Sequence, residues 1–182
     1  MREDSVKNWK ENRALACVVL AAAILGGTFG IGGAKLSSAA RSVNEAYAQN
    51  IAGDLALRAA AAQNIIAEGE AALGADAASV KTAKRAVEAL EAAEGPAQEY
   101  AANAALTASV DMLYEETRKV YGDDKGSVLQ TQWSEFLSRG NIIDNSADAY
   151  NEQARAAQKK LSGFPASLIA GLTGAQAEEF SA

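Results

Sequence analysis

The pattern of apolar residues is clearest between residues 127 and 161. Apolar or small side chains recur there in alternating steps of four and three. This spacing keeps one stripe facing a neighbour along a helix of about 52 Å, and it predicts a long helix with a coiled-coil-like seam. The stripe comprises Leu129, Trp133, Phe136, Gly140, Ile143, Ala147, Tyr150, Ala154, Ala157 and Leu161.

Three stripes with similar spacing precede this segment and predict three further helices. The first stripe comprises Leu36, Ala40, Val43, Tyr47, Ile51, Leu55, Arg58, Ala62, Ile65 and Leu73. The second comprises Val80, Ala83, Val87 and Leu90, and the third comprises Leu106, Val110, Leu113, Thr117 and Val120. Left-handed bundle packing is the simplest way to bury four such stripes.

Glycine, proline and aspartate mark the expected helix ends at Gly74-Ala75-Asp76, Gly95-Pro96, residues 122–126 and Gly163-Phe164-Pro165. We therefore expect an all-α protein with an elongated antiparallel four-helix bundle over residues 35–162. Residues 163–182 would form a C-terminal Phe-Pro tail. If the chain does not reverse at Gly74, three long helices result instead.

Composition supports helices and narrows the chemistry. The chain is rich in alanine and has two prolines, which favours helices over strands. Its net charge of −6 gives no electrostatic reason to bind nucleic acid. Histidine is absent and Cys17 is the single cysteine, which excludes an intrachain disulfide, His or Cys zinc sites and histidine-dependent triads. We expect no metal, cofactor or nucleic-acid partner.

Residues 14–34 form an uncharged run of 21 residues. As a helix this run would be about 31 Å long, which matches the hydrocarbon core of a bilayer. We expect a retained transmembrane helix that binds the lipid bilayer. A cleaved signal peptide is the alternative, although its apolar stretch is usually shorter.

The flanking charges predict the orientation of this span. Residues 1–13 carry four basic side chains, whereas Lys35 and Arg41 follow the span. The positive-inside rule then places a short tail, residues 1–13, in the cytoplasm and the bundle outside a single-pass cell membrane protein.

Small residues recur along one face of the predicted span, namely Ala22, Gly26, Gly30 and Ala34. Such a face lets two helices approach closely and would allow a homo-oligomer. Weakly hydrophobic spans contain many small residues in any case, which is the simpler interpretation.

Three short motifs stand near the end of the chain, namely Tyr150-Asn151, Phe164-Pro165 and Leu168-Ile169-Ala170-Gly171. With these motifs the end of the chain resembles the LemA family of membrane-anchored helical bundles. The resemblance implies an N-terminal anchor before a bundle, and it marks Tyr150, Asn151, Phe164, Pro165, Leu168 and Ile169 as binding positions. The chain departs from the family pattern at Gly140 and Ala147, where charged residues are expected, and at Ala157-Gln158, which replaces a second Tyr-Asn pair.

The Tyr-Asn pair and the apolar residues of the tail each have a structural as well as a functional interpretation. Tyr150 lies on the seam, so its hydroxyl needs a partner, and Asn151 is placed to bond a neighbouring helix or the tail. Polar contacts that fix helix register would account for both residues. Phe164, Leu168 and Ile169 could bind a partner or touch lipid, but we expect them to cap the bundle.

These observations favour a non-enzymatic, membrane-anchored interaction or scaffold protein of the bacterial cell envelope, with an envelope protein as partner. An extracytoplasmic ligand-sensing bundle is the alternative. A carboxylate-based hydrolase is a second alternative, although the adjacent pairs Glu115-Glu116 and Asp123-Asp124 suit a solvated surface better than a cleft. We predict no catalytic residue.

Overall fold

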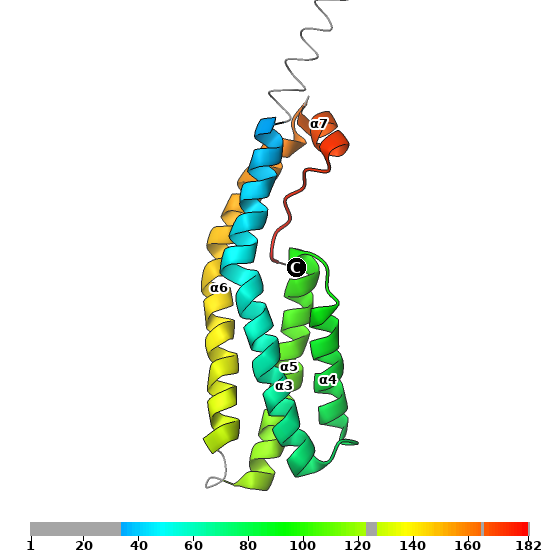
Figure 1. The fold of residues 1–182 in the computed structure, drawn as a ribbon, viewed down its shortest axis with the longest axis vertical. Coiled ribbons are helices and arrows are strands. Elements are labelled where there is room, and N and C mark those ends of the chain that lie inside the picture. The colour runs from blue at the N-terminus through cyan, green and yellow to red at the C-terminus, as the bar shows by residue number, and fades with distance from the viewer. Residues whose placement is uncertain (1–33, 123–126, 165, 182) are drawn as a thin grey trace, which may run out of the picture. The chain divides into compact units, whose positions relative to one another are not determined.

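A computed structural model describes residues 34–122, 127–164 and 166–181 (Figure 1). Within these ranges every regular element is a helix, which confirms the predicted all-α class. A helical segment covers residues 34–47 and continues through the π-helix η1 (Ala48–Ala52) into α3 (Gly53–Leu73). The remaining elements are α4 (Ala78–Glu91), α5 (Pro96–Tyr121), α6 (Ser127–Ser162) and α7 (Ala166–Thr173).

The helices end where glycine was expected to end them. Gly74, Gly95 and Gly122 have φ angles of 90°, 88° and 66°. Residues with a side chain are unfavourable in this backbone conformation, whereas glycine adopts it readily. Gly95 is also the N-cap of α5, and Pro96 occupies the first turn of this helix, where its missing N–H costs nothing. The chain therefore leaves α3 at Leu73 and does not continue as one helix to Gly95.

The chain divides into two compact units. Of the described residues, the larger unit holds 42–122, 127–158 and 177–181, and the smaller one holds 34–41, 159–164 and 166–176. Within the larger unit α3, α4 and α5 pack against one another, and successive helices from α3 to α6 reverse direction (Figure 1).

Most members of the predicted stripes form one core in the larger unit, whereas Leu36, Ala40 and Leu161 belong to the smaller unit. The fully buried members from α3, α4, α5 and α6 include Ile65, Val80, Leu106, Phe136 and Ile143. Trp133 and Ala147 are only half-buried. The prediction that Val120 belongs to a buried stripe is wrong, because Val120 is 56% exposed near the end of α5.

The π-helix η1 explains a local change of spacing in the first stripe. Val43, Tyr47, Ile51 and Leu55 follow one another in steps of four, which would rotate the stripe away from the core in a regular α-helix. A π-helical turn holds more residues and absorbs this drift. Val43, Ile51 and Leu55 are accordingly all buried.

The predicted membrane span falls almost wholly outside the described residues. This applies to residues 1–13, to the 14–34 segment apart from Ala34, and to Ala22, Gly26 and Gly30 on its proposed packing face. Ala34 begins the helical segment 34–47 and is exposed. Across the described parts of the chain, no helix combines the length and the apolarity needed to cross a bilayer.

Candidate functional site

Tyr150 and Asn151 lie next to each other on α6, and both side chains are buried. The Tyr150 hydroxyl donates to the carbonyl oxygen of Glu178 at 2.5 Å. The Asn151 amide forms two bonds with Phe180, since its Nδ2 donates to the Phe180 carbonyl oxygen at 3.0 Å and its Oδ1 accepts from the Phe180 N–H at 2.7 Å. Of the two partners that the sequence left open for Asn151, the structure therefore shows the tail.

A third α6 side chain completes this arrangement. Gln158 Nε2 donates to the carbonyl oxygen of Ala177 at 3.0 Å. We call Tyr150, Asn151 and Gln158 the clamp, and residues 177–181 the docked segment. The docked segment lies outside any helix, and the clamp binds four of its backbone groups. These side chains thus supply hydrogen-bond partners for backbone groups of the docked segment, which no helix satisfies.

An aromatic pocket receives the one large side chain of the docked segment. Phe180 is 2% exposed, and its ring centroid lies 5.2 Å from that of Tyr100 in an edge-to-face arrangement. The Tyr47 ring lies 6.0 Å from Phe180 and 5.3 Å from Tyr150. Tyr47 comes from the helical segment before η1, Tyr100 from the first turns of α5 and Tyr150 from α6, so the pocket exists only in the folded bundle.

Carboxylates surround the pocket and affect its tyrosines. Burial, followed by the charges of Glu178, Glu179 and Glu99, raises the pKa of Tyr150 to about 12. Burial and the hydrogen bond that the Tyr47 hydroxyl donates to Glu99 raise the pKa of Tyr47 well above its ordinary range. Both phenols therefore stay protonated at neutral pH and act as hydrogen-bond donors.

The two acidic residues of the docked segment lie in different surroundings, since Glu178 is close to the start of α5 and Glu179 is close to Arg155. The Glu178 Oε2 atom lies 2.7 Å from the position that a Cβ atom at Gly95 would occupy, and the φ angle of 88° at Gly95 independently favours glycine. Gly95 is the N-cap of α5, and the partial positive charge of a helix N-terminus favours a carboxylate. The Glu179 carboxylate lies 3.7 Å from Arg155 Nε.

The other predicted binding residues do not join the clamp. Phe164 is 86% exposed and Leu168 is 56% exposed, so the expectation that they cap the bundle is wrong. Phe164 lies between the ends of α6 and α7, and Leu168 lies on the exposed face of α7. Ile169 is buried, and Pro165 lies outside the described residues.

Sequence reasoning missed Phe180, Gln158, Tyr47 and Tyr100 as members of this site. A signal was present for Phe180, because it is the single large apolar residue in the polar stretch 173–182. No local pattern shows where such a residue docks. In the sequence Gln158 stands out only as a departure from the family pattern, yet its amide binds a backbone carbonyl of the docked segment as the Asn151 amide does.

A second polar cluster surrounds Arg58, which is 4% exposed in α3. Its guanidinium donates to Asn103 Oδ1 at 2.8 Å and to Thr107 Oγ1 at 3.0 Å, and it stacks over the Phe136 ring at 4.2 Å. Burial lowers the pKa of Arg58, an effect that Asp144 partly offsets. Gly140 leaves room for the guanidinium, because a Cβ there would lie 3.0 Å from Arg58 Cζ.

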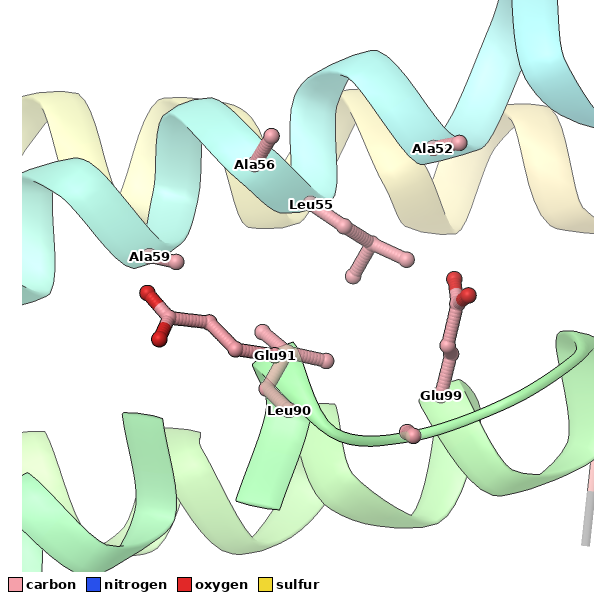
Figure 2. Close-up of a pocket in the computed structure, with 8 residues that line it drawn as sticks. Ala52, Leu55, Ala56, Ala59, Leu90, Glu91 and Glu99 are labelled. Atoms are coloured by element: carbon pink, nitrogen blue, oxygen red, sulfur yellow. The ribbon is translucent and has the colours of Figure 1, made fainter. Parts of the chain in front are cut away.

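A small pocket of about 190 Å³ lies between the start of α3 and the α4–α5 connection (Figure 2). Alanine and leucine side chains form most of its wall, and the carboxylates of Glu91 and Glu99 extend toward α3. Each carboxylate already accepts a hydrogen bond, from Gln63 and Tyr47 respectively. The remaining lining residues are alanine and leucine, so Glu91 and Glu99 are the two polar groups of the pocket.

The carboxylates of the adjacent pair Glu115-Glu116 bond to two different partners. Glu115 pairs with Arg118 at 2.9 Å and Glu116 accepts from Ser79 at 2.5 Å, while Asp123-Asp124 lie outside the described residues. In the part of the chain that the structure describes, no three His, Cys, Asp or Glu side chains are grouped to hold a metal ion. Comparison of the chain with protein-family models, curated proteins and solved structures finds no match.

Proposed function

We propose that the chain is a non-enzymatic interaction or scaffold protein, anchored in the membrane of the bacterial cell envelope, whose bundle binds a protein partner. The observation that carries this proposal is the clamp. Tyr150, Asn151 and Gln158 direct all their inter-segment hydrogen bonds at peptide backbone atoms. Side chains arranged in this way bind a polypeptide, whereas catalysis needs groups directed at a reacting atom.

The anchored architecture belongs to the same proposal. It comprises a cytoplasmic tail over residues 1–13, a span over residues 14–34, and an elongated antiparallel four-helix bundle outside the membrane. The uncharged 21-residue run supports the span. The likeness of the chain's end to the LemA family supports the combination of anchor and bundle.

The smaller unit offers further support for a membrane-proximal location. Phe164, Leu168 and Leu172 are 86%, 56% and 78% exposed, and their four-residue spacing places both leucines on one face of α7. Lys159 and Lys160 precede them in the last turn of α6. Exposed apolar residues beside basic ones suit the surface of an anionic bilayer.

A ligand-sensing bundle is the second candidate, and the pocket of about 190 Å³ is the observation that favours it. An alanine-rich wall with two carboxylates would suit a small organic cation. The hydrophobic pocket is small for a drug-sized ligand, however, and its carboxylates are already bonded within the protein.

Chemical crosslinking in intact membranes, followed by purification of the full chain in detergent, tests the proposal. We expect a protein partner to co-purify at a fixed stoichiometry. A small molecule that raises the Tm of the purified chain, with no stoichiometric protein partner, would favour sensing instead. Turnover of a glycan that is lost on replacing one carboxylate would contradict the non-enzymatic proposal.

A further inference from the structure

The contacts that hold the docked segment are mostly independent of its sequence. Four of its backbone groups bond to the clamp, and the three clamp side chains all come from α6. A backbone amide or carbonyl of another polypeptide could occupy the same positions. The clamp is therefore a recognition surface for an extended peptide, of which the chain's own segment is one example.

The aromatic pocket and the charges beside it define what such a peptide must carry. The Phe180 ring fills the space between Tyr47 and Tyr100, so an aromatic anchor is required. Glu178 lies at the N-cap of α5, and Glu179 lies beside Arg155. Of the two acidic residues directly before the anchor, Glu179 therefore meets a guanidinium, whereas Glu178 shares the start of α5 with the carboxylate of Glu99.

The docked segment can leave this surface without unfolding a helix. Residues 177–181 belong to no regular element and the clamp residues lie on α6, so release of the segment breaks no hydrogen bond within a helix. The segment thus competes with any other peptide at an effective concentration set by the chain that tethers it.

We propose that the clamp and the aromatic pocket form a binding site for a partner protein segment with an acidic residue directly before an aromatic one, which displaces the docked segment. This inference rests on the proposed function, because it assigns the partner-binding surface of an interaction protein. The docked segment then acts as an internal competitor that keeps the site closed until a partner of higher affinity arrives.

Titration of a fluorescent peptide into the full chain in detergent tests the proposal. The peptide carries the sequence of residues 173–182, TGAQAEEFSA. Binding to the Phe180→Ala chain should be at least tenfold tighter than to the original chain, because Phe180→Ala weakens the internal competitor. Adding Asn151→Ala to Phe180→Ala should weaken peptide binding at least tenfold, since it removes two of the four backbone bonds.

Two controls keep this experiment decisive. Phe164→Ala removes the same side chain where it is 86% exposed and should bind the peptide like the original chain. Phe180→Leu keeps a smaller apolar anchor and should give intermediate affinity if Phe180→Ala fails to fold. A peptide with alanine in place of its phenylalanine should not bind to either Phe180 variant.

Three results would overturn the inference. One is that neither Phe180 variant binds the peptide more tightly than the original chain. The second is equal binding with and without Asn151→Ala. The third is a concentration-dependent dimer of the original chain that disappears on Phe180→Ala, since the occupant would then be a second copy. If a membrane partner is still captured by the Asn151→Ala chain, the proposed function stands and only this site is rejected.

Discussion

Asn151 forms two hydrogen bonds with the backbone of Phe180, 29 residues further along the chain. Its amide oxygen accepts from the Phe180 N–H and its amide nitrogen donates to the Phe180 carbonyl oxygen. One buried side chain on α6 thus fixes both the position and the direction of the docked segment.

Asn151→Ala should release the docked segment while leaving the bundle folded. Loss of these two buried hydrogen bonds should cost about 1–3 kcal/mol of docking free energy. Hydrogen exchange at the Phe180 amide measures the effect, because that N–H donates to Asn151 in the original chain. Asn145→Ala, an exposed asparagine on the same helix, is the matched control and should leave exchange unchanged. Continued protection of Phe180 in Asn151→Ala would contradict this prediction.

Phe180→Ala and Phe164→Ala should have different effects on stability. Phe180 is 2% exposed, so its loss should lower the free energy of unfolding by about 1.5–3 kcal/mol, the value of burying such a side chain. Phe164 is 86% exposed, so its loss should change stability by less than about 0.5 kcal/mol. Urea unfolding followed by circular dichroism compares the two. Equal losses would show that Phe180 is not an anchor.

Alkaline pH should destabilise the chain partly through Tyr150. Its pKa is about 12 in the folded protein against an ordinary value of 10.0, so folding favours the protonated phenol. This stabilisation is complete below about pH 10 and is lost as the pH rises through about 12. Tyr150→Phe should therefore reduce the fall in stability between pH 9.5 and 11.5, as measured by urea unfolding.

The remaining alkaline loss in Tyr150→Phe should come partly from Tyr47, whose pKa is also raised by burial and Glu99. At pH 8 the same variant should lose about 1 kcal/mol, because the hydrogen bond to the Glu178 carbonyl oxygen is gone. An unchanged pH dependence in Tyr150→Phe would show that the Tyr150 environment has been misassigned.

Alanine should have opposite effects at two helical glycines. At Gly53 a Cβ meets nothing within 4 Å, so Gly53→Ala should stabilise the protein by roughly 0.5–1 kcal/mol through helix propensity. At Gly140 a Cβ would lie 3.0 Å from Arg58 Cζ, while Asn103 and Thr107 hold the guanidinium in place. Gly140→Ala should therefore destabilise by about 1–2 kcal/mol through overpacking. Thermal unfolding of both variants provides the comparison, and a stabilised Gly140→Ala would contradict it.

The sequence predicted the helices well because their determinants are local. Apolar spacing identified the buried stripes, and Gly74, Gly95 and Gly122 marked helix ends that the structure confirms. Arg58 was placed on the buried stripe in spite of its charge, and it is buried. The π-helix η1 was not predicted, although four-residue steps between Val43 and Leu55 were visible in the sequence.

The site was predicted only in part because its contacts are long-range. Tyr150 and Asn151 could be selected as polar residues on or beside a seam that need partners. Their partner depends on how residues 177–181 return to α6, and the spacing of apolar residues does not predict this return. The Phe-Pro motif indicated Phe164 as a binding position, whereas the buried aromatic side chain of the tail is Phe180.

The most direct test of the account is partner capture by crosslinking in intact membranes, measured per molecule of full chain. Three variants are compared with the original chain: Phe180→Ala, Asn151→Ala and the control Asn145→Ala. We predict that Phe180→Ala raises capture because the site is vacated, that Asn151→Ala abolishes it, and that Asn145→Ala leaves it unchanged. Equal capture of the same partner by all four chains would contradict the claim that the clamp binds it.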